Sequence, residues 1–221
     1  MASKRQFAVI GLGRFGSSLA LTLAQEGFEV FGIDKDEDVV NRWANKLTHA
    51  VAANTVDEEV LRSLGLRNFD CVIVAIGDDV QANILTSQLL KELGVKTVVA
   101  KALSDIHGKV LARIGVDRVI FPERDMGERV AHQLISPNLL DFIELSKEYS
   151  IAELSVPPKI SGRTLRELNL RAMYGFSVVA IKRKNGIVIA PTADDRLDQS
   201  DIMVVIGTLV QIEHFERNIS Y

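Results

Sequence analysis

The chain has 221 residues, of which 47% are hydrophobic, and its formal net charge is −3. This length suits one nucleotide-binding domain and a smaller second domain. The small net charge, without a run of Lys or Arg, gives no reason to expect nucleic acid as a partner. No apolar stretch approaches the length of a membrane span, and a lone cysteine, Cys71, excludes a disulfide within the chain. We therefore expect a cytoplasmic protein.

The first predicted strand, residues 7–10, leads into the motif G-x-G-x-x-G, formed by Gly11, Gly13 and Gly16, and an amphipathic helix follows. Gly11 would allow a tight turn, Gly13 would let backbone amides approach a phosphate, and Gly16 would let the helix pack against the sheet. About 20 residues further on, Asp34 ends the second predicted strand, where a carboxylate can bind ribose hydroxyls. Together these features predict a nucleotide-binding site.

The alternation of apolar strands and helices continues as far as a sixth strand. Further strands are predicted at 49–52, 71–75, 97–100 and 118–121, with helices at 57–64, 80–93 and 105–114. A closing helix is predicted with Asp125 as N-cap and Glu128 three residues later, the capping-box pattern. The pattern indicates an α/β fold with a Rossmann-type doubly wound parallel sheet of order 3-2-1-4-5-6, whose ligand lies between the first and fourth strands.

The pattern changes near residues 136–138. Residues 139–145 form a short amphipathic segment, which we interpret as a helix within a linker over 137–148. It is either an ordinary domain linker or an element swapped onto a partner chain. Strands are then predicted at 151–156, 176–182, 187–189 and 202–206, with helices at 164–168 and 210–217 and a tight hairpin turn at Asn185 and Gly186. We expect a nucleotide-binding domain over 1–136 and a small α+β domain over 149–221.

Several side chains follow the carboxyl ends of the predicted strands, where the ligand of such a sheet lies. Asp34 would accept hydrogen bonds from a ribose and repel a 2′-phosphate, although adjacent Lys35 weakens that exclusion. Asn54 and Thr55 lie where an adenine edge is usually met, and Asn54 also suits a turn. The segment that ends the fourth predicted strand leaves room for a ribose and base, or for close helix packing: Ala75, Ile76 and Gly77.

Charged residues near the glycine motif complete the predicted site. Arg14 is a fixed cation beside Phe15 in the glycine turn, and its long side chain is either solvated or directed to phosphates of a neighbouring subunit. Lys101 ends the fifth strand on the ligand side, where we interpret it as a phosphate contact. Glu123 follows the sixth strand, where a carboxylate can help hold Mg²⁺ or Ca²⁺ near the phosphates.

The sequence offers no evident catalytic group. Its four histidines are scattered, and none has the spacing of a metal site or a triad. A dehydrogenase needs a residue that moves a proton against the hydride, and the second domain offers only His214. We therefore predict a ligand-binding switch and not an enzyme, with an NAD(H) sensor or NAD-dependent oxidoreductase as the alternative. A redox-responsive DNA-binding repressor would need a basic recognition helix, which we do not find.

The chain resembles the RCK (TrkA-type) regulatory subunits of bacterial Ktr potassium transporters, of the KtrA or KtrC kind, over nearly its whole length. The resemblance is carried by segments 7–16, 49–51, 66–77, 122–126, 168–175 and 201–207. It implies a dimer that assembles into an octameric ring on a membrane K⁺-translocating subunit of the KtrB or KtrD kind. The protein would then be peripheral to the inner face of the cell membrane.

In this family ATP or ADP occupies the first domain, and ATP favours the conducting state. The resemblance implies that the phosphates lie at Gly11, Gly13 and Gly16, the ribose at Asp34, and the base at Asn54 and Ile76. It also implies that Arg14 contacts the γ-phosphate in the adjoining subunit and that Glu123 helps bind a divalent cation between subunits.

The resemblance also implies that the second domain can bind cyclic di-AMP, which lowers activity. The matching surface would include Leu170, Arg171, Ser177 and Pro191. The family often has Asn where Ser177 stands and Lys where Met173 stands, so this sequence lacks an amide and a charge at that surface.

Overall fold

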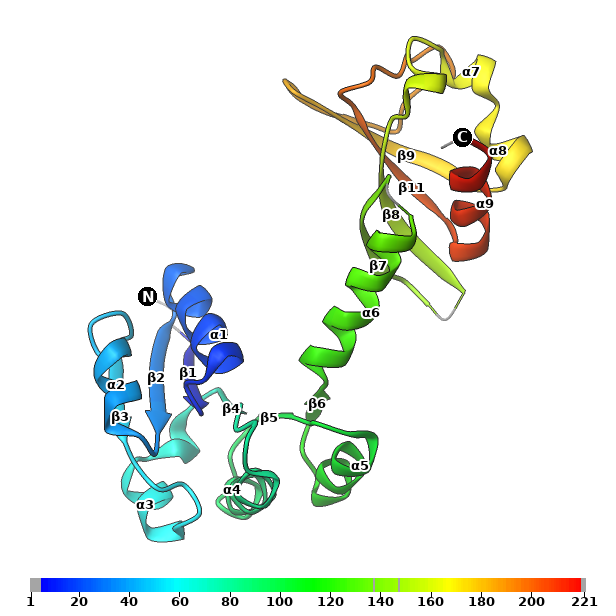
Figure 1. Ribbon diagram of the computed structural model, residues 1–221. Coiled ribbons are helices and arrows are strands. Elements are labelled where there is room, and N and C mark those ends of the chain that lie inside the picture. Colours follow the sequence, from blue (N-terminus) through cyan, green and yellow to red (C-terminus); the bar gives the residue numbers. More distant parts are fainter. Residues whose placement is uncertain (1–4, 137, 147, 220–221) are drawn as a thin grey trace. The chain divides into compact units, whose positions relative to one another are not determined.

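The computed structural model describes residues 5–136, 138–146 and 148–219. The chain divides into two compact units, the first ending at Arg124 and the second beginning at Asp125. Figure 1 shows the first unit in blue to green and the second in green to red. The division falls inside helix α6 (Pro122–Ile135), earlier in the chain than the boundary predicted after residue 136.

The first unit contains one parallel six-stranded sheet. Its strands are β1 (Gln6–Ile10), β2 (Glu29–Asp34), β3 (His49–Ala52), β4 (Cys71–Val74), β5 (Val98–Lys101) and β6 (Arg118–Ile120). They lie in the order β3-β2-β1-β4-β5-β6, and every pairing is parallel. The predicted doubly wound fold and strand order are confirmed.

Helices follow the strands in alternation. They are α1 (Arg14–Gln25), α2 (Glu37–Trp43), α3 (Glu58–Ser63), α4 (Val80–Glu92), α5 (Asp105–Ile114) and the 3₁₀ turn η1 (Leu66–Asn68). Four begin after a side chain that accepts hydrogen bonds from the N–H groups of the first turn, which stabilises the helix start. These capping residues are Asp36, Asp57, Asp79 and Ser104.

Side chains of β1 alternate between two cores, one on each face of the sheet. Ala8 and Ile10 pack in a core that also contains buried residues of α3, α4 and α5. Val9 packs in a second core with residues of α1 and α2. Because successive side chains of a strand point to opposite faces, these two cores lie on opposite faces of the sheet. Each core includes helix residues, so helices cover both faces. This explains why the strands read as continuous apolar runs.

The second unit is an antiparallel sheet packed against short helices, which confirms the predicted α+β class. Its strands β7 (Leu139–Glu144), β8 (Tyr149–Ser155), β9 (Ser177–Arg183), β10 (Gly186–Ile189) and β11 (Ile202–Thr208) lie in the order β10-β9-β11-β8-β7. The helices are η2 (Pro158–Ile160), α7 (Leu165–Leu168), α8 (Leu170–Tyr174) and α9 (Leu209–Ile219). At the centre, the rings of Phe176 and Phe215 meet edge to face with centroids 5.2 Å apart.

Two predictions about the join between the units were wrong. Residues 139–144 form strand β7, paired with β8, and not a linker helix. A short apolar run suits either structure, and pairing with β8 satisfies its backbone groups. Asp125 is not an N-cap, because α6 begins at Pro122, whose fixed φ suits the first helical turn. Residues 137 and 147 of the predicted linker lie outside the described residues. Among the described residues, no helix is both long and apolar enough to cross a membrane.

Candidate nucleotide-binding site

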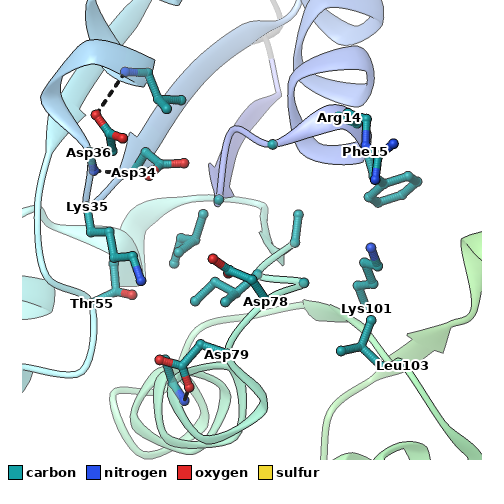
Figure 2. Close-up of a pocket in the computed structure, with 18 of the residues that line it drawn as sticks. Arg14, Phe15, Asp34, Lys35, Asp36, Thr55, Asp78, Asp79, Lys101 and Leu103 are labelled. Atoms are coloured by element: carbon teal, nitrogen blue, oxygen red, sulfur yellow. Dashed lines mark hydrogen bonds between the residues drawn. The ribbon is translucent and has the colours of Figure 1, made fainter.

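A cavity of about 690 Å³ lies at the carboxyl ends of β1, β2, β4 and β5. The strand order reverses between β1 and β4, which is where doubly wound sheets bind ligands. In Figure 2, Arg14 and Phe15 lie on one side of the cavity and Lys35 on the opposite side, with Lys101 below Phe15. Every residue predicted for the nucleotide site lines the cavity except Gly16: Gly11, Gly13, Arg14, Phe15, Asp34, Lys35, Asn54, Thr55, Ala75, Ile76, Gly77, Lys101 and Glu123.

The three glycines of the motif have different surroundings. Gly11 has a φ of 92°, in the left-handed region that favours glycine. Gly16 is buried, and a Cβ there would lie 1.9 Å from the carbonyl oxygen of Gly11, so α1 can pack under the turn only without a side chain. A Cβ on Gly13 would meet nothing within 4 Å. Gly13 lines the cavity just before α1, so it leaves the helix N-terminus, a favourable site for anions, open to a ligand.

Asp34 connects the end of β2 to the glycine turn. Its Oδ2 accepts a hydrogen bond from Leu12 N at 2.7 Å, and its Oδ1 accepts one from Asp36 N at 3.1 Å. Each carboxylate oxygen has two acceptor positions, so both oxygens can accept a further hydrogen bond. The side chain can therefore hold the turn and still bind ribose hydroxyls.

Lys101 and Glu123, both predicted to contact the ligand, pair with each other. The Lys101 side chain is 8% exposed, and its Nζ donates a hydrogen bond to Glu123 Oε1, whose side chain is 64% exposed. This hydrogen bond is the main reason that the pKa of the Glu123 carboxyl is lowered. The lysine is therefore a nearly buried cation held at the cavity wall.

The two residues after β3 differ in exposure. Thr55 is buried, and its hydroxyl oxygen lies 3.0 Å from the hydroxyl oxygen of Thr86 on α4. Asn54 is exposed, and its Oδ1 accepts a long hydrogen bond of 3.5 Å from Val56 N. The Asn54 amide thus closes a turn only weakly and keeps its amide hydrogens for other partners.

Several residues of the cavity were not predicted from the sequence. Asp78 and Asp79 directly follow Gly77, and Asp79 also caps α4 by accepting a hydrogen bond from Ala82 N. Their position after a strand end was the signal that could have identified them. The other unpredicted lining residues are Ile10, Asp36, Val39, Ala53, Val56, Ala82, Ala102, Leu103, Phe121 and Arg124.

The described part of the chain does not supply a complete metal site. It contains no group of three or more His, Cys, Asp or Glu side chains that could hold a metal ion. Glu123 offers one oxygen ligand of the kind that Mg²⁺ and Ca²⁺ prefer. Any cation at Glu123 would need further oxygen ligands from water, a bound molecule or another subunit.

The four residues predicted for a second ligand differ in accessibility. Leu170 is 4% exposed and packs in the core of the second unit. Arg171 is exposed, while Ser177 and Pro191 are half-buried. Leu170 can therefore support such a surface from beneath, whereas the other three reach solvent.

Comparison with known proteins identifies both units. The TrkA-N domain model matches residues 7–122, and the TrkA-C domain model matches residues 151–220. The chain is 50% identical to Ktr system potassium uptake protein C of Bacillus subtilis over 216 residues, 98% of each protein. It is 46% identical to Ktr system potassium uptake protein A of the same organism over 213 residues, 96% of each.

Among solved structures, the fold is similar to that of the GsuK channel bound to NAD, with a TM-score of 0.66 and 18% identity. That similarity covers 99% of this chain and 40% of the channel, and it concerns the fold alone. The two domain matches, and the identity of 50% and 46% over nearly the whole chain, establish the family. The chain belongs to the family of Ktr potassium-uptake proteins, RCK regulatory subunits built from a TrkA-N and a TrkA-C domain.

Proposed function

We propose that this protein is an ATP/ADP-responsive regulatory subunit that forms a ring on a membrane K⁺-translocating partner and controls potassium uptake. The observation that carries the proposal is that one cavity combines the open N-terminus of α1, the strand-end carboxylate Asp34 and the nearly buried cation Lys101. The helix N-terminus and Lys101 suit the phosphates of a nucleotide, and Asp34 suits its ribose. The relatives with 50% and 46% identity are named as potassium uptake proteins.

The charges around the cavity support a role for a divalent cation. Its lining contains five carboxylates and four cationic side chains: Asp34, Asp36, Asp78, Asp79 and Glu123, and Arg14, Lys35, Lys101 and Arg124. The phosphates of a nucleotide would add negative charge to a lining in which carboxylates already outnumber cationic side chains. Mg²⁺ or Ca²⁺ shared between Glu123 and phosphate oxygens would offset that charge. ATP binding should therefore depend on the cation more than ADP binding does.

Arg14 is the side chain that we propose distinguishes ATP from ADP. It is the first residue of α1, it lines the cavity and it is exposed. An exposed arginine at the mouth can reach a γ-phosphate held by an adjoining subunit of the ring. ATP would then stabilise a different ring shape from ADP, because a ligand shifts an equilibrium only by its differential affinity for the two states.

The second unit provides a proposed site for cyclic di-AMP. Arg171 is the cation of the predicted surface, which also includes Ser177 and Pro191. An arginine can form bidentate hydrogen bonds with a phosphate of this ligand. We place the protein at the inner face of the cell membrane, attached through its partner, and without enzymatic activity.

Calorimetric titration of the nucleotide-stripped protein tests the proposal. The ligands are ATP, ADP, NADH and cyclic di-AMP, each with and without Mg²⁺ or Ca²⁺, and light scattering reports the oligomeric state. We expect ATP and ADP to bind tightly, ATP in a cation-sensitive manner, and NADH weakly. Lys101→Met should weaken the binding of both ATP and ADP. Lys109→Met should leave their binding unchanged, because Lys109 is exposed and lies outside the cavity lining.

Tight NADH binding that ATP does not compete would overturn the proposal in favour of a redox sensor. A monomer in every nucleotide state would overturn the ring. Steady release of phosphate from ATP would contradict the non-enzymatic role. With the ligand established, K⁺ flux through vesicles that contain the membrane partner measures whether ATP and ADP have different effects.

A further inference from the structure

We propose that Asn83, a wholly buried amide on α4 that does not line the cavity, is a positioning residue for Lys101. This inference rests on the proposed function, because it concerns how the nucleotide cavity places its phosphate-binding cation. Asn83 was not among the residues predicted from the sequence.

Asn83 joins the ends of two strands. Its Nδ2 donates hydrogen bonds to the carbonyl oxygens of Ile76, 2.8 Å away, and Lys101, 3.1 Å away. Ile76 follows β4, and Lys101 is the last residue of β5. One amide group therefore fixes the separation of two backbone segments that both line the cavity.

The Asn83 side chain is suited to this task and poorly suited to simple packing. Both of its partners are carbonyl acceptors, so only the NH₂ group can face them, and an Asp there would bring oxygen against oxygen. Asn83 is 0% exposed, and its Oδ1 has no hydrogen-bond partner among the described residues. A buried acceptor without a partner costs stability. A leucine of similar size would avoid that cost but would take the donor away from both carbonyl oxygens, so the amide is explained by the bridge it forms and not by packing.

The consequence of this bridge is a close fit between Gly77 and Lys101. Gly77 directly follows Ile76, and a Cβ on Gly77 would lie 2.9 Å from Lys101 Nζ. The lysine ammonium therefore occupies the space that a side chain at Gly77 would take. Glu123 holds the ammonium itself, whereas Asn83 holds the backbone from which the lysine extends. Without that bridge, the backbone of Lys101 could shift and carry the ammonium away from this wall and from the phosphates of the ligand.

A double-mutant cycle on the full-length protein tests the inference, with ADP affinity and thermal unfolding as its two readouts. Asn83→Leu should weaken ADP binding about tenfold, the loss expected for one displaced charged contact. In a Lys101→Met background the same change should cost less than about twofold, because no cation remains to be positioned. Ser87→Ala is the matched control, since Ser87 is wholly buried on the same helix and does not line the cavity.

A tenfold loss in both backgrounds, or no loss in the wild-type background, would overturn the role of Asn83 and leave the proposed function intact. Failure of the wild-type protein to bind ADP or ATP would overturn the proposed function, and this inference with it. If Asn83→Leu shows no cooperative unfolding, Asn83→Ser takes its place in the cycle. Its hydroxyl can donate to only one carbonyl, so we expect an intermediate loss that also vanishes with Lys101→Met.

Discussion

Asp34 Oδ2 accepts a hydrogen bond from the backbone N–H of Leu12 at 2.7 Å. A single carboxylate thus connects the end of β2 to the turn that follows β1, and these strands are parallel neighbours in the sheet. The ribose and the phosphates of a nucleotide would contact these two segments. A change at Asp34 should therefore affect both the recognition of the ribose and the position of the phosphate-binding turn.

We expect Asp34→Ala to weaken ADP binding and to reduce discrimination against a 2′-phosphate. Loss of a charged acceptor costs about 1.5–3 kcal/mol, so the Kd for ADP should rise at least about tenfold. The Kd for adenosine 2′,5′-bisphosphate should rise less or fall, because its repulsion from the carboxylate is removed. Calorimetry with both ligands measures the ratio. Asp38→Ala, an exposed carboxylate of α2 outside the cavity lining, should leave it unchanged. Equal weakening of both ligands would contradict the repulsion.

Arg14→Ala should lower the preference for ATP over ADP. If Arg14 meets the γ-phosphate of an adjoining subunit, its removal costs the assembled ring about tenfold in ATP affinity and less than about twofold in ADP affinity. Competition titrations on the assembled protein give the two values. Arg113→Ala removes an exposed arginine of α5 that does not line the cavity, and both affinities should then stay at the wild-type level. Equal losses for ATP and ADP would rule out the γ-phosphate contact.

The sheet of the first unit could be predicted because each strand is a short apolar run bounded by a turn glycine or a capping residue. Right-handed crossovers then leave few possible strand orders. Strand β7 could not be predicted in the same way. Its six residues are compatible with a helix, and only pairing with β8, for example of Ile143 with Ile151, decides between the two.

Most of the cavity lining could be predicted for one geometric reason, which is that the carboxyl ends of parallel strands meet at one edge of the sheet. Asp34 and Lys101 are both strand-end residues and were found in this way. The pairing of Lys101 with Glu123 and the bridge formed by Asn83 depend on contacts across 22 and 18 residues of sequence, respectively. A polar residue within a helix gives no local signal that it will be buried.

Gly16→Ala should destabilise the first unit. The new methyl group would lie 1.9 Å from the carbonyl oxygen of Gly11, so either the turn or α1 must move. Overpacking of this kind typically costs about 1–3 kcal/mol. Gly127→Ala in α6 is the matched control, because its Cβ meets nothing within 4 Å and alanine favours a helix. Urea unfolding followed by circular dichroism compares the two, and a Gly16→Ala protein of wild-type stability would contradict the close packing.

Asp117 links α4 to β5 from the loop before β6. Its Oδ2 accepts hydrogen bonds from Lys91 Nζ at 2.8 Å and from Val98 N at 2.7 Å. These bonds, that from Lys91 above all, lower the pKa of the Asp117 carboxyl below its ordinary value of 3.8. The group is therefore more acidic in the folded protein than in the unfolded chain.

This difference predicts a dependence of stability on pH. The ionised carboxylate stabilises the folded state above its unfolded pKa of 3.8, and that contribution is lost as the pH falls through the lower, folded pKa. The free energy of unfolding of the wild type should therefore decrease as the pH falls below about 4. In Asp117→Asn the decrease should be smaller, because the amide does not titrate. Urea unfolding between about pH 7 and pH 3 measures both slopes. Glu26→Gln removes an exposed carboxylate at the end of α1 and should keep the wild-type slope. The wild-type slope in Asp117→Asn would contradict the assignment.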